Sequence, residues 1–213
     1  MSANIYQPYR YWKKEEIEAK ALEILQKMDA DPKYRLRWPL DPTRVAEFLG
    51  LDTDIIDLDE SEGIAAMIWP IQGKILINER NDRLSKGFQE SSIAHEIGHW
   101  VLHVNRRNIQ EYDRNRDLSA PIALHRHYRD KEEKGIEWQA QYFASCLLMP
   151  RFILEKKRRG RDLTNWLHLR AMAEDLGVTK SNLIHRLKDL EWIVIPENSR
   201  RIYLGKALQD RQS

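Results

Sequence analysis

The segment from Ser91 to Val104, with the sequence SSIAHEIGHWVLHV, constrains this chain more than any other stretch. Its apolar residues recur at steps of three and four, which predicts an amphipathic helix. His95 and His99 are four residues apart, so a helix places both imidazoles on one face, one turn apart. Glu96 lies about a quarter turn away. The segment can therefore offer two nitrogens to one metal ion, with a carboxylate beside them.

The order His-Glu-x-x-His is typical of zinc hydrolases, in which the glutamate acts as a base towards water. The alternative is a helix whose histidines only make hydrogen bonds at the edge of a core. The surroundings favour a metal site, because the helical run contains no proline and Gly98 leaves space between the two histidines. A catalytic zinc takes three protein ligands and keeps one position open, so the third ligand must come from elsewhere in the chain.

The segment from Ile136 to Leu148, IEWQAQYFASCLL, predicts a second helix that can supply this ligand. Glu137 lies near its predicted start, on one stripe with the small Ala144, and small residues let two helices approach closely. We therefore expect Glu137 to reach a metal held by His95 and His99. Spacing alone is equally consistent with an ordinary exposed glutamate in a first helical turn. The other candidates for the third ligand are His103, Asp113, His125, His127, Glu132 and Glu133.

Together these motifs resemble those of the ImmA/IrrE metallopeptidases, a family of the gluzincin HExxH type. The first motif, HEIGHWVLH, follows a strand that ends in KILINER. The second, EWQAQYFASCLLMP, fits the family pattern E-x-x-A-x-x-F-A-x-x-L-L-M-P. The resemblance covers about residues 42–195. It implies a zincin-like domain with a zinc ion held by His95, His99 and Glu137, and with Glu96 as the catalytic base.

Two features depart from the family pattern. Gln141 stands where the family often has asparagine, and the connection Asn105–Gly135 is long and rich in charge. Such a connection either borders the cleft or is a solvated, partly helical insertion. A metzincin is excluded, because it needs glycine at position 102 and histidine at position 105, where this chain has Leu102 and Asn105.

Several side chains are candidates for supporting roles around the metal. His103 lies one turn beyond His99 on the same helix, which already supplies two ligands. We therefore interpret His103 as a hydrogen-bonding group behind the ligands. Amide hydrolysis also needs a donor for the oxyanion. The candidates for that donor lie in the charged connection and are Tyr112, His125, His127 and Tyr128.

The rest of the N-terminal part predicts an α+β fold with a small sheet. Helical spacing and an Asp-Pro start signal indicate helices, and apolar β-type runs joined by a turn indicate a hairpin. We expect the strand Lys74–Asn78 to hold an extended peptide by edge pairing. The expected elements are helices at Lys13–Met28 and Thr43–Leu49, a strand at Thr53–Leu58, and hairpin strands at Ile64–Trp69 and Lys74–Asn78.

The C-terminal part resembles a winged helix-turn-helix. Helices are predicted at Leu163–Leu176 and up to about Leu190, and two β-type runs that can form a hairpin follow them. The basic run Lys156–Arg161 contains a glycine and marks the predicted boundary. We therefore expect a zincin-like metallopeptidase domain at residues 1–160 and a winged helix-turn-helix-like module at residues 161–213.

This module has two possible partners. Basic and polar side chains on its second helix and on its wing favour DNA, whereas nearby acidic residues dilute the charge. The alternative is that its helices pack on the protease or hold a protein substrate. The residues expected to contact DNA or substrate are Lys180, Asn182, Arg186, Arg200 and Arg201.

Composition limits the remaining classes. The chain has 213 residues, of which 42% are hydrophobic, which is enough for one core and a small appended module. The net charge of +2 gives no overall argument for nucleic acid. The single cysteine, Cys146, excludes an internal disulfide, and its apolar neighbours predict that it packs as a small hydrophobe. Neither a signal peptide nor a membrane span is recognisable, so we expect a cytoplasmic protein.

The predicted function is zinc-dependent proteolysis. By resemblance, the substrate is a helix-turn-helix transcriptional repressor that is cleaved in response to stress or to a signal from a mobile element. Two alternatives have a silent or structural zinc site: a DNA-binding regulator and an interaction protein such as one half of a toxin–antitoxin pair.

Overall fold

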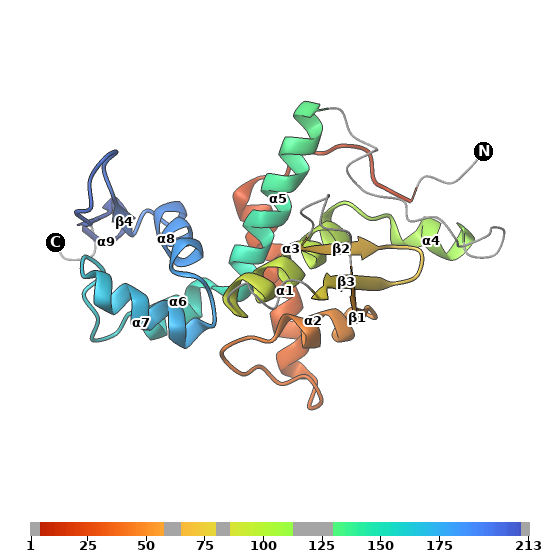
Figure 1. Cartoon of the computed structure of the whole chain (residues 1–213), viewed down its shortest axis with the longest axis horizontal. Helices are drawn as coiled ribbons and strands as arrows, with labels where there is room; N and C mark the ends of the chain where they lie inside the picture. Colours follow the sequence, from red (N-terminus) through yellow and green to blue (C-terminus); the bar gives the residue numbers. More distant parts are fainter. Residues whose placement is uncertain (1–4, 58–64, 80–85, 113–129, 210–213) are drawn as a thin grey trace.

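The structure, a computed structural model, describes residues 5–57, 65–79, 86–112 and 130–209. It has a mixed α+β fold, with the small sheet and the C-terminal helices on opposite sides of helices α3 and α5 along the long axis (Figure 1). The elements are α1 Lys14–Ala30, α2 Pro42–Phe48, β1 Asp52–Ile56, β2 Ala66–Trp69, β3 Lys74–Asn78, α3 Lys86–Leu102, α4 Arg106–Tyr112, α5 Asp130–Leu148, α6 Arg151–Lys157, α7 Trp166–Leu176, α8 Lys180–Asp189, β4 Ile193–Val194, β5 Tyr203–Leu204 and α9 Lys206–Gln209.

Local sequence signals account for most of the N-terminal elements. Helix α2 begins where the Asp-Pro pair predicts, and the Asp41 side chain accepts a hydrogen bond from the backbone N–H of Thr43. Helix α5 differs from its prediction, because it begins at Asp130, six residues before Ile136. Glu137 therefore lies in the interior of α5 rather than in its first turn. The charged residues before Ile136 hide this extension, since they carry no apolar periodicity.

The three-stranded sheet has the order β1-β3-β2. Strands β2 and β3 form the predicted antiparallel hairpin, with Ile68 opposite Ile75, and β1 pairs with β3 in parallel, with Thr53 opposite Ile75. Strand β3 is therefore the central strand, and the prediction that Lys74–Asn78 offers a free edge is wrong. Apolar alternation marks a strand but does not give its position in the sheet. The free edge beside α3 belongs to β2.

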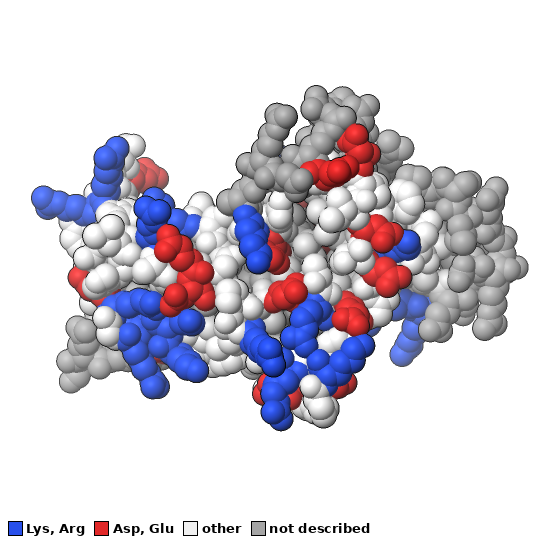
Figure 2. All heavy atoms as spheres, turned by 60° about the horizontal axis from the view of Figure 1, so that its bottom comes forward, with Lys and Arg blue, Asp and Glu red and all other residues white. Residues whose placement is uncertain are grey.

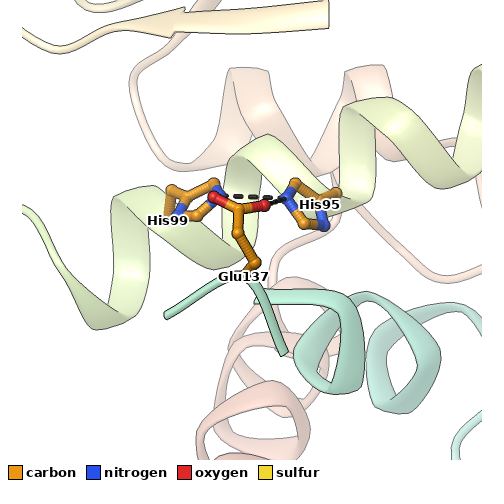
Figure 3. Close-up of side chains that lie close together, drawn as sticks. All are labelled: His95, His99 and Glu137. Carbon is orange, nitrogen blue, oxygen red and sulfur yellow. Dashed lines mark hydrogen bonds and ion pairs between the residues drawn. The ribbon is translucent and has the colours of Figure 1, made fainter. Parts of the chain in front are cut away.

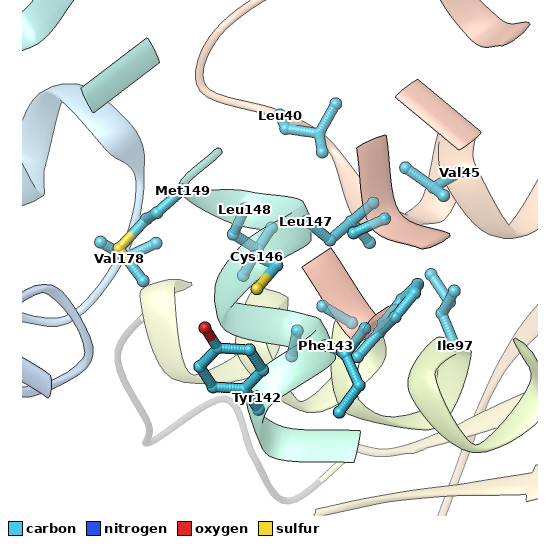
Figure 4. Packing of buried hydrophobic residues seen from close by; sticks show 14 of the residues in the cluster. Leu40, Val45, Ile97, Tyr142, Phe143, Cys146, Leu147, Leu148, Met149 and Val178 are labelled. Carbon is cyan, nitrogen blue, oxygen red and sulfur yellow. The ribbon is translucent and has the colours of Figure 1, made fainter. Parts of the chain in front are cut away.

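Helices α3 and α5 pack against each other through very small residues. A Cβ atom added to Gly98 on α3 would lie 2.9 Å from both the Cα and the carbonyl oxygen of Ala140 on α5, so only glycine fits there. Around this contact, Ile97 of α3 and Phe143 of α5 belong to one buried apolar cluster (Figure 4). This close approach determines where side chains on the two facing helices meet.

Cys146 lies inside this cluster with 1% of its surface exposed (Figure 4). Burial raises the pKa of its thiol to about 12. The prediction that this cysteine packs as a small hydrophobe is therefore confirmed.

The C-terminal helices pack onto the rest of the protein. Gly177, with a φ of 67°, ends α7, and the side chain of Thr179 caps α8. Within α8, Arg186 is fully buried: it donates to the carboxylate of Glu18 at 2.8 Å and to the backbone carbonyl of Met149 at 3.2 Å. The expectation that Arg186 contacts DNA or substrate is therefore wrong. Helices α6 and α9 are not predicted by the sequence.

The other basic side chains of this part differ in their surroundings. Lys157 and Arg161 both pair with Asp175, so the basic run before the predicted boundary is partly neutralised. Figure 2 shows Lys and Arg side chains over the C-terminal helices with Asp and Glu side chains among them. Arg200 and Arg201 are exposed between β4 and β5. None of the described helices is long and apolar enough to cross a membrane.

Replacement of the buried guanidinium should strongly destabilise the fold. We expect Arg186→Ala to lower the free energy of unfolding by about 3 kcal/mol, because it removes the buried guanidinium's hydrogen bonds to Glu18 and to the carbonyl of Met149. Lys188→Ala, at an exposed position of the same helix, should change it by less than about 0.5 kcal/mol. Urea unfolding of the two variants measures the difference. Equal, small effects would show that the buried pair contributes little.

A second prediction concerns Glu90 on α3, whose Oε2 atom is buried without a hydrogen-bond partner among the described residues. Burial, and secondarily the charge of Asp41, raises the pKa of Glu90 above its ordinary value of 4.5. The folded state therefore binds this proton more tightly than the unfolded state. The resulting stability is present at acid pH and is lost as pH rises through the folded pKa.

We therefore expect Glu90→Gln, which stays neutral, to raise the melting temperature relative to the parent protein at about pH 8. The gain should disappear at about pH 3, where the carboxyl group is protonated in both states. Glu197→Gln, at an exposed loop position, provides the control and should show no such trend. A gain for Glu90→Gln that is independent of pH would contradict the explanation.

Candidate metal centre

Three side chains from α3 and α5 converge at the helix contact (Figure 3). The Nε2 atoms of His95 and His99 lie 2.9 Å apart. The carboxylate of Glu137 lies across from them, with Oε2 at 2.9 Å from Nε2 of His95 and Oε1 at 3.3 Å from Nε2 of His99. The contact between Gly98 and Ala140 permits this meeting, because it brings the backbones of the two helices together beside these residues.

This donor set fits a divalent metal ion. The three ligand atoms all lie within 4.8 Å of one another, and in the part of the chain that the structure describes no other group of His, Cys, Asp and Glu side chains meets this criterion. Tetrahedral zinc with bonds of about 2.0–2.1 Å places its ligand atoms roughly 3.4 Å apart. The observed separations of 2.9–3.3 Å need only a small outward adjustment. Two imidazoles and one carboxylate are also a common catalytic zinc set.

The electrostatics of the group suit metal binding. Burial would raise the pKa of Glu137, but its hydrogen bonds to His95 and His99 outweigh burial and hold the pKa well below the ordinary value. Burial lowers the pKa of His99. Burial would also lower the pKa of His95, but its hydrogen bond to Glu137 and the charge of Glu96 raise it. Glu137 is thus anionic and His99 neutral, as metal coordination requires.

A buried chain of hydrogen bonds runs from His99 to the backbone of Arg10. The backbone carbonyl of Arg10 can only accept, so the amide nitrogen of Gln139 donates to it at 3.0 Å. The amide oxygen of Gln139 then faces Nε2 of His103 at 3.1 Å. Nδ1 of His103 lies 3.0 Å from Nδ1 of His99.

These contacts determine the tautomers. His103 must carry its proton on Nε2 in order to donate to Gln139, so its Nδ1 accepts from Nδ1–H of His99. His99 therefore keeps a lone pair on Nε2, the atom that faces His95 and Glu137. Burial, followed by the charge of His99, lowers the pKa of His103 to about 3, which keeps it neutral.

Gln139 is a functional candidate that sequence reasoning missed. It is fully buried on α5, on a helical stripe with the apolar residues Ile136, Phe143 and Cys146. A polar residue that interrupts an apolar stripe at this spacing is the signal that could have identified it. Its partner is a backbone carbonyl, which no side-chain pattern could indicate.

Glu96 lies beside the three converging side chains and is tied to the sheet. Its Oε2 atom accepts a hydrogen bond of 2.9 Å from the backbone N–H of Ile68 on the edge strand β2. Burial raises the pKa of Glu96 to about 7, although the charge of His95 opposes this rise. A carboxylate with a pKa near neutrality is well suited to accept and return a proton.

A cavity of about 350 Å³ opens beside this group. His95, Glu96 and Gln141 line one side, and Phe88, with 41% of its surface exposed, lies at its rim. His95 and Glu96 therefore border a space that can admit part of a ligand.

Among the remaining candidates, His103 is the one whose side chain the structure describes. His103 lies behind His99, as the sequence predicts. His125, His127 and Tyr128 fall outside the described residues, as does Asp113. Tyr112 ends α4, and the structure does not describe its side chain or those of Glu132 and Glu133.

The mixed α+β fold thus carries a group of side chains that could hold a divalent metal ion. The chain belongs to the peptidase family M78, which is described as the IrrE N-terminal-like domain and matches residues 50–188. Among solved structures, it is similar to a Mycobacterium tuberculosis transcriptional regulator, with 16% identity and a TM-score of 0.51 over 89% of this chain. The match spans 51% of that regulator, and it supports the fold alone. None of the curated proteins matches this chain.

The hydrogen-bond chain predicts a graded effect on metal affinity. His103→Leu should weaken metal binding by roughly 10–100-fold, because His99 loses the acceptor that selects its tautomer. Gln139→Leu removes a more distant member and should cost less. A competitive chelator titration of each purified variant measures the affinity directly. Unchanged affinity in His103→Leu would show that this chain does not prepare the site.

Proposed function

We propose that this protein is a zinc-dependent endopeptidase in which His95, His99 and Glu137 hold the metal and Glu96 is the catalytic base. The observation that carries the proposal is the convergence of three donor atoms within 4.8 Å, next to the half-buried carboxylate of Glu96 and an open cavity. Membership of the M78 peptidase family supports the same chemistry.

Each side chain has a distinct task in this proposal. Zinc supplies Lewis-acid polarisation of the scissile carbonyl and makes water more acidic. The N–H of Ile68 holds one oxygen of Glu96, so the other oxygen is available to take a proton from the attacking water. Glu96 then gives this proton to the leaving amine. His103 and Gln139 keep His99 in the tautomer that leaves its Nε2 lone pair available.

The proposed substrate is a helix-turn-helix repressor in the cytoplasm, by resemblance to the ImmA/IrrE family. The edge of β2 that is not paired with β3 supports binding of an extended segment, because it lies beside Glu96. The Ile68 N–H donates to Glu96, so a peptide would pair with the other backbone groups of this edge. We further propose that residues 1–160 form the zincin-like domain and residues 161–213 a winged helix-turn-helix-like module. The order α7, turn, α8 and a β4–β5 hairpin supports this division.

Contacts of α8 favour a role in holding protein substrate over a role in binding DNA. Arg186 is buried, and the side-chain amide of Asn182 donates to Ser91 on α3 at 2.6 Å, so the face carrying them is turned towards the protease. Lys180, Arg200 and Arg201 are exposed and could contact either partner. The module is therefore proposed as a wall of the protease cleft.

Glu96→Gln tests the proposed mechanism. The amide oxygen can still accept from Ile68, so the fold and the bound zinc should be retained, but loss of the base should slow cleavage by at least about 10²-fold. Cleavage of a co-expressed helix-turn-helix repressor and zinc content per chain are the two measurements. Glu15→Gln, an exposed position on α1, is the matched control.

The two measurements separate the parts of the proposal. Retained cleavage in Glu96→Gln would end its assignment as the base. His95→Ala should lose both zinc and cleavage, and full activity without bound metal would reject the metal site.

A further inference from the structure

A second cavity, of about 440 Å³, lies between α5 and α8. It shares three lining residues, Ser91, Gln141 and Asn182, with the cavity at the candidate metal centre. The two spaces therefore adjoin, and a bound chain can occupy both of them.

The hydrogen bond between α8 and α3 marks the boundary between the cavities. The amide of Asn182 donates to Ser91 Oγ at 2.6 Å, and Ser91 Oγ in turn donates to the carbonyl of Gly87 at 2.8 Å. Both side chains line both cavities. The C-terminal part of the chain thus contributes directly to the space that begins at Glu96.

The walls of the second cavity are chemically different from those at the metal centre. Trp138 stacks on Tyr142, with ring centroids 5.6 Å apart and an angle of 16° between the planes, and Leu148 and Met149 extend this apolar wall. The one lining carboxylate, Asp189, pairs with Lys14 at 2.6 Å. The other lining residues are mostly polar, and the one carboxylate among them is already paired. An aromatic and apolar wall in such a cavity favours an uncharged, bulky side chain.

We propose that the cavity between α5 and α8 is a specificity subsite that accepts a bulky apolar or aromatic side chain of the peptide substrate near the scissile bond. This inference rests on the proposed peptidase function and adds a substrate preference to it. Helix α8 then helps to select the substrate, because Ser181, Asn182 and His185 form the wall opposite Trp138 and Tyr142.

Exposed aromatic rings at both cavities support a peptide as the occupant. Phe88 borders the cavity at the metal centre with 41% of its surface exposed, and Trp138 borders the second with 38% exposed. Large exposed rings beside a cavity are typical of surfaces that bind proteins or peptides. At the cavity beside the metal centre, the edge of β2 can hold peptide backbone through groups other than the Ile68 N–H, which already donates to Glu96.

The test uses one substitution that makes the proposed subsite smaller and one that makes it larger. Ser145→Leu places a larger side chain in the cavity from α5, and Trp138→Ala removes part of the wall. Tyr203→Ala, which removes an exposed ring from β5, is the matched control. The probe is a pooled synthetic peptide library that is digested by the zinc-loaded full chain, with cleavage sites read by mass spectrometry.

We expect Ser145→Leu to reduce cleavage next to bulky apolar residues by roughly 10–200-fold relative to cleavage next to small residues. Trp138→Ala should weaken selection for aromatic residues by roughly tenfold. Tyr203→Ala should keep the parent preferences. Unchanged preferences in both cavity variants would overturn the subsite while leaving the peptidase proposal intact.

A binding measurement separates this inference from the peptidase proposal. Fluorescence anisotropy of labelled library peptides with the Glu96→Gln chain reports selection without cleavage. If the parent cleaves no peptide, but Glu96→Gln prefers bulky apolar peptides and the added Ser145→Leu removes that preference, the subsite stands and the peptidase proposal fails. Absence of any preference in binding would overturn the subsite.

Discussion

The backbone contact between Gly98 and Ala140 is the constraint on which the rest of the site depends. It brings α3 and α5 so close that any side chain at position 98 would meet the backbone of the other helix. Only at this separation can Glu137 on α5 meet His95 and His99 on α3. Alanine would favour the helix over glycine by about 1 kcal/mol, so the chain gives up local helix stability to obtain this geometry.

The N-terminal segment contacts the C-terminal end of α3 and stabilises it there. Tyr6 bridges to Val104 just after α3, and the backbone N–H of Gln7 donates to the carbonyl of His103 at 2.8 Å. The carbonyl of Arg10 then anchors the hydrogen-bond chain to His99. Residues at the start of the chain therefore help to determine the tautomer of a candidate ligand about 90 positions later.

How much could be predicted from the sequence depends on whether a feature is local. Periodicity predicted α3, and the spacing of His95 and His99 placed both on one face. Spacing alone left the role of Glu137 open, and the family resemblance supplied it, while charged residues concealed the true start of α5. The central position of β3 depends on pairing with a distant strand, and Arg186 pairs with Glu18 across the fold, so neither carries a local signal. An arginine on a helix gives the same sequence pattern whether its side chain faces a DNA groove or the core of the protein.

The burial of Cys146 has a consequence for how the protein can sense its surroundings. Its thiol is enclosed in the core and stays protonated in the neutral range, whereas oxidants and alkylating agents react with exposed thiolates. The chain has no other cysteine. An oxidative signal therefore finds no reactive sulfhydryl on this chain while it is folded, and a single cysteine introduced at the surface would serve as a unique attachment point for a spectroscopic label.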